Sequence, residues 1–148
     1  MVKFGKKEIL RESKPYIIAE IGVNHEGSIS QAKELIELAK EGGADAAKFQ
    51  TYKAEKIASV HSPHYWDISK ESTKSQYQLF KKYDSFEVID YEELAKHCQN
   101  CNIDFLSTPF DLDAVDSLDP LMNAFKIASA DITNIPLLRK VASKNKPI

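Results

Sequence analysis

The sequence has few of the residues that would place it in a specialised class of protein. Its 148 residues include two cysteines, five glycines and one tryptophan, and no apolar stretch approaches membrane-spanning length. Two cysteines cannot form the disulfide framework of a small secreted protein. The net charge is −2 and no basic run is present, so neither nucleic acid nor an anionic membrane is expected as a partner. The charged N-terminus does not resemble a signal peptide, and we expect a cytoplasmic protein.

The sequence does contain a repeated unit of strand, polar loop and helix. Its first copy begins with an apolar run that ends at Glu20, which predicts a strand buried on both faces. Ser28 and Gln31 have the spacing of a capping box at the start of the next helix. The expected strands are Tyr16–Gly22, Asp45–Tyr52, Ile103–Thr108 and Ala124–Ser129. Three of the expected helices are Ile29–Glu41, Asp111–Ser117 and Ile135–Ser143. A fourth helix is capped by Asp90 and runs to Asn100.

Two segments fall outside this repeat. The polar segment Met1–Lys14 is expected to form a short hairpin that closes the bottom of the fold. Lys53–Val88 is a long insertion after the second strand, and we expect it to contain a helix of its own. The aromatic residues of that helix are Tyr77, Phe80 and Tyr83. Insertions at this place often shape a site, but a packed surface excursion explains this one equally well.

Two pairs of metal-ligand residues are interpreted as inert. His61 and His64 lie in the insertion, and the proline between them argues against a helix that would hold a metal. Cys98 and Cys101 form a C-x-x-C at the end of a helix, whereas a redox pair is normally activated at a helix start. A zinc site there would need two more close ligands, and only His97 is near in the sequence.

Four strand–helix units in one direction predict a parallel sheet with right-handed crossovers, as an open doubly wound sheet or as part of a (β/α)8 barrel. Polar residues lie within or just after the carboxyl end of each expected strand. They are Glu20, Lys48, Gln50, Ser107, Thr108, Lys126, Ser129 and Asp131. In a barrel these ends converge on one site, whereas a Rossmann sheet would need a G-x-G-x-x-G turn that this chain lacks. We therefore predict an α/β fold, the N-terminal half of a TIM barrel.

Lys48 and Lys126 are the central candidates for the chemistry. Each lies between apolar residues inside an expected strand, where burial lowers a lysine pKa by up to roughly 3–5 units unless the charge has a partner. Two such lysines near Ser and Thr hydroxyls predict a cradle for a phosphate or a carboxylate, with about 1.5–3 kcal/mol for each charged contact. The alternative is that each lysine pairs with a carboxylate, Glu20 or Asp131.

Four segments in order carry a family resemblance. They are Ile-Ala-Glu-Ile-Gly-Val-Asn-His-Glu-Gly, Ala-Lys-Phe-Gln-Thr, Ser-Thr-Pro-Phe and Phe-Lys-Ile-Ala-Ser-Ala-Asp. Together they resemble the sialic acid synthase family, which includes the N-acetylneuraminate, legionaminate and pseudaminate synthases, over the chain from about Tyr16 onward. The resemblance implies condensation of phosphoenolpyruvate with an N-acetylated aminosugar aldehyde to a nine-carbon sialic-type acid, with phosphate release. It also implies a divalent metal, manganese or magnesium.

The resemblance implies a role for each matching residue. Those that match phosphoenolpyruvate-binding positions are Lys48, Thr108, Lys126 and Ser129. Gln50 and Asp131 match positions that contact the sugar, and Glu20 matches the acid beside the metal-bound water. The catalytic set is thus Glu20, Lys48, Lys126 and Asp131. Asp131 ends an Ala-Ser-Ala-Asp segment where many N-acetylneuraminate synthases have Gly-Ser-Gly-Glu, so the resemblance does not fix the aminosugar.

Members of this family are more than twice as long as this chain. They have eight strands, metal-binding histidines in the later strands and a small antifreeze-like C-terminal domain. We therefore expect residues 1–148 to be an N-terminal fragment without metal ligands of its own, inactive alone, with open strand edges that favour a homodimer. Two other readings remain: another phosphoenolpyruvate-condensing barrel or Schiff-base aldolase with Lys48 or Lys126 as nucleophile, and a non-catalytic half-barrel that binds an anion.

Overall fold

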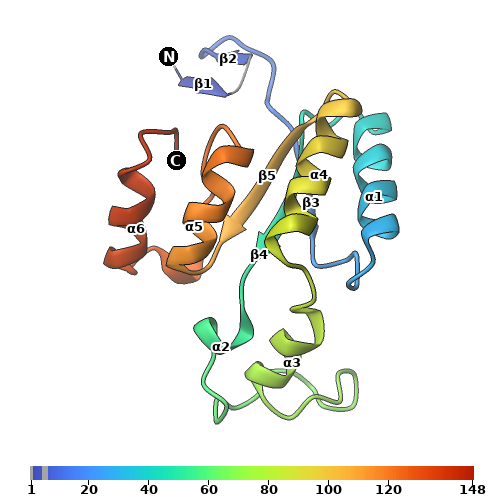
Figure 1. The fold of residues 1–148 in the computed structure, drawn as a ribbon, viewed down its shortest axis with the longest axis vertical. Helices are drawn as coiled ribbons and strands as arrows, with labels where there is room; N and C mark the ends of the chain where they lie inside the picture. Colours follow the sequence, from blue (N-terminus) through green and yellow to red (C-terminus); the bar gives the residue numbers. More distant parts are fainter. Residues whose placement is uncertain (1, 5–6) are drawn as a thin grey trace.

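The computed structural model describes residues 2–4 and 7–148 and shows a twisted parallel sheet with helices packed around it (Figure 1). The sheet has the strand order β3 (Ile18–Gly22), β4 (Ala46–Thr51) and β5 (Asp104–Pro109), and both neighbouring pairs are parallel. The helix α1 (Ile29–Glu41) connects β3 to β4, and α4 (Val88–Asn100) leads into β5. These connections confirm the predicted α/β fold with a parallel sheet.

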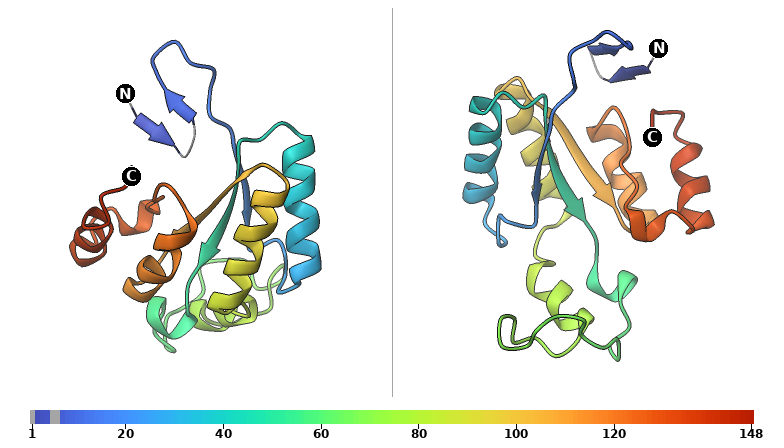
Figure 2. Two further views of the ribbon diagram at one scale, coloured as in Figure 1. Left: turned by 45° about the horizontal axis from the view of Figure 1, so that its top comes forward. Right: turned by 180° about the vertical axis from the view of Figure 1, so that it is seen from behind.

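The other elements lie beyond the strand ends and beside β5. The hairpin of β1 (Val2–Phe4) and β2 (Lys7–Ile9) lies at the amino ends of the strands, as predicted, although its turn is outside the described residues. The insertion holds α2 (Ala54–Ile57) and α3 (Gln76–Tyr83), beyond the carboxyl end of β4 (Figure 1). The helical segments that follow β5 lie together on one side of the molecule, with α5 (Leu112–Leu118) packed against β5 (Figure 2). The others are η1 (Asp119–Leu121), η2 (Ser129–Asp131) and α6 (Ile135–Ala142).

The main core lies between the sheet and the helices α1 and α4, which pack side by side. Ile36 of α1 and Leu94 of α4 are fully buried, and on the sheet the rings of Phe49 and Phe105 stack with centroids 5.7 Å apart. Each such side chain contributes about 1.5–3 kcal/mol when it leaves water. In the part of the chain that the structure describes, we find no helix long and apolar enough to span a membrane.

Several predicted elements are confirmed within a residue or two. The first helix has the predicted bounds, with Ser28 as its N-cap, and the helix expected in the insertion is α3. The start of α4 was predicted wrongly. Glu87 is its N-cap and Asp90 lies in the first turn, where its carboxylate accepts the Glu87 N–H at 2.7 Å. The two acidic side chains satisfy the free N–H groups of that turn, so the helix begins earlier than predicted.

The fourth predicted strand, Ala124–Ser129, is not a strand. Its Phe125 N–H donates to the Pro147 carbonyl at 2.8 Å, and the Ser107 N–H of β5 contacts the Met122 sulfur at 3.4 Å. The hydrogen bonds that would have joined this segment to β5 therefore have other partners. The described residues form a three-stranded parallel sheet rather than the four units predicted.

The first strand was also predicted to be buried on both faces, and this is wrong. Ile17 and Ile18 are 54% and 40% exposed. The exposure is concentrated at the amino end of β3, since Ile21 and Gly22 at its carboxyl end are buried. β3 is also an edge strand, with β4 on one side only. Edge strands present unpaired backbone groups that favour further pairing.

A close approach at Gly27 joins the loop after β3 to the end of the insertion. Gly27 has a φ of +81°, and an added Cβ would lie 2.7 Å from the Ser85 hydroxyl oxygen. Gly43 has a similar φ of +83° but nothing within 4 Å of such a Cβ. The two glycines thus share the left-handed backbone conformation, but only at Gly27 would an added Cβ contact another residue.

We predict that Gly27→Ala lowers the free energy of unfolding by about 1 kcal/mol more than Gly43→Ala does. Both substitutions cost about 1 kcal/mol because alanine disfavours the left-handed backbone, but only Gly27→Ala also crowds Ser85. Denaturant unfolding of both variants measures the difference. Ser85→Ala in the Gly27→Ala background is expected to recover part of it. Equal losses in the two single variants would show that the approach to Ser85 has no energetic effect.

Candidate functional site

Four of the predicted site residues lie on one face of the sheet. Side chains alternate along a strand, so Lys48 and Gln50 point to the face opposite Phe49, which packs in the helix-covered core. The strand register places Glu20 beside Lys48, and Thr108 beside Gln50. Three neighbouring parallel strands therefore present a carboxylate, an ammonium group, an amide and a hydroxyl side by side.

Lys48 is at the centre of this group. It is 8% exposed, its ammonium group forms an ion pair with the Glu20 carboxylate, and it donates to the Thr108 hydroxyl oxygen at 3.4 Å. The Glu20 side chain is 52% exposed. A buried ammonium group without a partner would be strongly destabilising, so the Glu20 carboxylate offsets the cost of burying this charge. For Lys48, the structure shows the pairing that the sequence left as an alternative.

An irregularity in β3 brings Glu20 close to Gln50. The β3–β4 register shifts between Glu20 and Gly22, and Gly22 adopts a φ of +59°. A Cβ added at Gly22 would lie 3.3 Å from a Glu20 carboxylate oxygen and 3.5 Å from the Gln50 amide nitrogen. The Glu20 carboxylate and the Gln50 amide thus both lie close to Gly22, and a larger residue at this position would crowd them. The Tyr91 hydroxyl donates to the backbone carbonyl of Gln50 at 3.0 Å and holds this end of β4 in place.

The other predicted residues lie apart from this group. Lys126 is exposed and donates to the carbonyl of its own neighbour, Ile127. Ser129 is exposed, and Asp131 accepts a hydrogen bond from the Asn134 amide at 3.1 Å. Across the described residues, no hydrogen bond or ion pair joins Lys126, Ser129 or Asp131 to Lys48. The predicted burial of Lys126 is wrong because its segment does not join the sheet.

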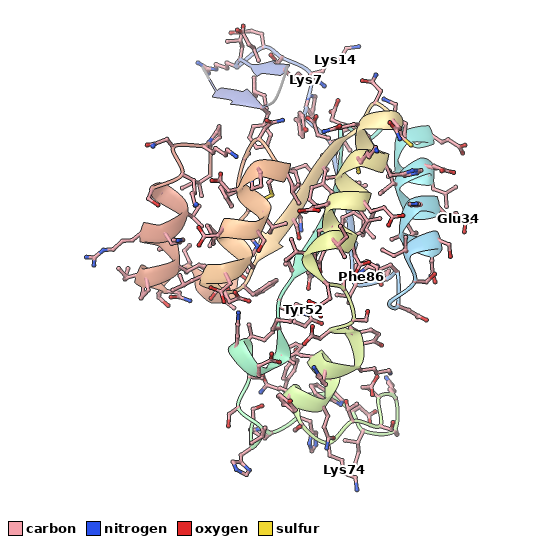
Figure 3. All side chains as sticks on the ribbon, in the orientation of Figure 1. Lys7, Lys14, Glu34, Tyr52, Lys74 and Phe86 are labelled. Carbon is pink, nitrogen blue, oxygen red and sulfur yellow. The ribbon has the colours of Figure 1, made fainter. Side chains whose placement is uncertain are left out.

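A cavity of about 110 Å³ lies at the base of the insertion. Tyr52 and Phe86 both line the cavity (Figure 3). The chain enters the insertion after Tyr52 and leaves it close to Phe86. Thr51 also lines the cavity, and its side chain points to the opposite face of the sheet from Gln50. There the Thr51 hydroxyl shares a 2.7 Å hydrogen bond with the buried Ser107 hydroxyl. No predicted site residue lines this cavity. Ser107 forms a structural contact with Thr51 and does not lie beside Lys48.

His25 is a buried residue that the sequence did not single out. It is 1% exposed, and its ring stacks on Phe86 with centroids 4.1 Å apart and planes 12° apart. Its Nδ1 accepts the Gly27 N–H at 3.1 Å, and its Nε2 has no hydrogen-bond partner. His25 thus joins the loop that follows Glu20 to the end of the insertion. It lies among polar and charged residues in the sequence, so nothing local signals its burial.

Burial lowers the pKa of His25, because a charged imidazolium in this apolar place would be unsolvated. In the unfolded chain a histidine titrates near 6.5. Below about pH 6.5 the unfolded state takes up a proton that the folded state resists, so we predict that the free energy of unfolding decreases as pH falls, by at most about 1.4 kcal/mol per pH unit.

Denaturant unfolding at several pH values measures this slope. His25→Gln should be less stable at neutral pH but should lose the part of the slope below pH 6.5 that His25 causes. His61→Gln, at an exposed position of the insertion, is the matched control and should keep the full slope. An unchanged slope in His25→Gln would contradict the assignment.

Comparison with known proteins identifies the family. The NeuB family matches residues 35–148, more than half of the chain. The N,N'-diacetyllegionaminic acid synthase of Campylobacter jejuni is 45% identical over 138 residues, which are 91% of this chain and 41% of that protein. The chain spans about two fifths of the length of the curated relatives it matches.

Two solved structures share the fold over nearly the whole chain. The N-acetylneuraminic acid (sialic acid) synthetase of Leptospira borgpetersenii, in complex with citrate, superposes with a TM-score of 0.73 at 28% identity, over 97% of this chain and 48% of that one. The spore coat polysaccharide biosynthesis protein SpsE of Bacillus subtilis superposes with a TM-score of 0.74 at 33% identity, over 98% of this chain and 38% of that one. With the family match, these likenesses confirm the resemblance read from the four segments: the chain belongs to the NeuB family of sialic acid synthases.

Proposed function

We propose that this chain supplies the N-terminal half of the (β/α)8 barrel of a synthase that condenses phosphoenolpyruvate with an N-acetylated aminosugar aldehyde and releases phosphate. The observation that carries this proposal is the buried Lys48, held between Glu20 and Thr108 on three neighbouring strands, in a chain that belongs to the NeuB family. The activity is that of the whole protein, and the 148-residue chain alone is not expected to release phosphate.

Lys48 binds an anionic group of phosphoenolpyruvate in this proposal. A buried ammonium group gives a stronger contact to a phosphate or carboxylate than an exposed one, because less water competes. Thr108 is within reach of the same nitrogen, at 3.4 Å, and its hydroxyl can donate to the bound anion. Gln50 lies on the same face and offers amide hydrogen-bonding groups to the sugar.

Substrate binding also changes the state of Glu20. In the structure its carboxylate is the anion that pairs with Lys48. A substrate anion competes for that ammonium group and displaces Glu20, whose side chain is half exposed and has room to move. The freed carboxylate, next to Gln50 and Gly22, can then accept a proton from water. Binding of the substrate and activation of the base are thereby linked through Lys48.

The residues around Lys48 do not fit a divalent metal. Manganese and magnesium favour several oxygen ligands. Glu20, the carboxylate beside Lys48, is already paired with it, and Asp104, at the amino end of β5 on the same face, accepts a hydrogen bond from the Tyr16 hydroxyl. We therefore assign no step of this chain's residues to the metal. Its ligands, the later strands and the homodimer remain predictions for the whole protein, as do the roles of Lys126, Ser129 and Asp131.

We predict that Lys48→Met and Lys126→Ala, made in the longer protein, raise the KM for phosphoenolpyruvate about ten- to hundredfold, the equivalent of one lost charged contact. Phosphate release with manganese and a panel of N-acetylated aminosugars measures this. Lys14→Ala, an exposed lysine near the N-terminal hairpin (Figure 3), is the control and should change nothing.

Three outcomes would contradict the proposal. Unchanged kinetics for Lys48→Met would remove Lys48 from the anion site. Trapping of Lys48 or Lys126 by borohydride with a carbonyl substrate would show a Schiff-base aldolase instead. Binding of phosphoenolpyruvate by the longer protein without turnover of any aminosugar would favour a non-catalytic anion-binding barrel.

A further inference from the structure

A histidine, a cysteine and a glutamate meet on the surface between α1 and α4. The His97 Nε2 lies 3.0 Å from a Glu37 carboxylate oxygen and 3.5 Å from the Cys101 sulfur. The three ligand atoms all lie within 4.8 Å of one another, and no other group of this kind occurs among the described residues. His97 and Cys101 are four residues apart, on the same face at the end of α4. Glu37 comes from α1 and completes a set that the C-x-x-C spacing alone did not reveal.

The separations are close to those of ligands around one zinc ion. Zinc binds a histidine nitrogen at about 2.0–2.1 Å, a cysteine sulfur at about 2.3 Å and a carboxylate oxygen at about 2.0–2.2 Å, with tetrahedral angles. These bond lengths place nitrogen and sulfur about 3.5 Å apart, and nitrogen and oxygen about 3.3 Å apart. The corresponding distances here are 3.5 Å and 3.0 Å, so an ion could enter after small side-chain movements.

We propose that Glu37, His97 and Cys101 form a binding site for zinc or a similar divalent transition metal, with water as the fourth ligand. On binding, the Cys101 thiol loses its proton to solvent as the sulfur–metal bond forms, and the metal keeps its oxidation state. The proton that His97 Nε2 donates to Glu37 moves through solvent to Nδ1, so that the Nε2 lone pair binds the metal and the carboxylate oxygen exchanges this hydrogen bond for a metal bond.

This site is separate from the proposed substrate site. The last turn of α4 leads into the start of β5, whereas Thr108 lies near the carboxyl end of that strand. Glu37 and His97 belong to the two helices that cover one face of the sheet. A metal there would join α1 to α4 and stabilise the folded chain, by an amount that grows with the logarithm of its affinity and concentration.

Cobalt(II) titration of the reduced chain tests the proposal. One equivalent of cobalt should give a sulfur-to-cobalt charge-transfer band together with the intense visible bands of a tetrahedral ion, and zinc should displace it because it binds such sites more tightly. Cys101→Ser should abolish the charge-transfer band. Cys98→Ala is its matched control: Cys98 is in the same motif but fully buried, and this variant should keep the band.

A second matched pair distinguishes the carboxylate. Glu37→Gln should weaken cobalt binding at least about tenfold. Glu34→Gln, an exposed glutamate one turn earlier on α1 (Figure 3), should leave binding unchanged. The proposal is overturned if stoichiometric cobalt gives no sulfur band, if the band survives in Cys101→Ser, or if Glu34→Gln and Glu37→Gln bind equally. Metal held only by exposed histidines such as His61 would give no sulfur band and would likewise overturn it.

Discussion

The ion pair between Lys48 and Glu20 is the interaction on which the rest of the account depends. Burial of the Lys48 ammonium group, which is 8% exposed, is costly unless an anion is next to it, and Glu20 is that anion. The pair exists because two parallel strands bring the residues into register, and the register shifts between Glu20 and Gly22, where Glu20 and Gln50 both lie close to the glycine. Removal of Glu20 would leave an uncompensated buried charge on Lys48, and exchange of Glu20 for another anion would not.

The sequence predicted those parts of the fold that local patterns determine. The helix Ile29–Glu41 has a serine cap, an apolar face and a glycine stop, and it was predicted to the residue. The strands β4 and β5 were also predicted, because both are buried on two faces. The segment around Lys126 has the same composition as a buried strand, but whether it joins the sheet depends on hydrogen bonds to distant partners such as Pro147. No local pattern reports such partners.

The same distinction applies to the sites. Polar residues at strand ends can be read from the sequence, and strand register brings Glu20, Lys48 and Thr108 together. His25 and Glu37 could not be found in this way. The burial of His25 depends on Phe86, and Glu37 meets His97 across two helices, so each contact joins residues about sixty apart in the chain. Contacts of this kind follow from packing, which a single sequence does not display.

Phosphoenolpyruvate binding to Glu20→Gln and Lys48→Met, measured by calorimetry in the longer protein without the sugar, tests the central claim most directly. The two substitutions remove opposite ends of one ion pair. If Glu20 holds the place of the substrate anion, Glu20→Gln removes a competitor and should bind phosphoenolpyruvate more tightly than the unmodified protein, whereas Lys48→Met should bind it at least about tenfold more weakly. Weaker binding in both variants, or unchanged binding in both, would show that substrate does not exchange with Glu20 at Lys48.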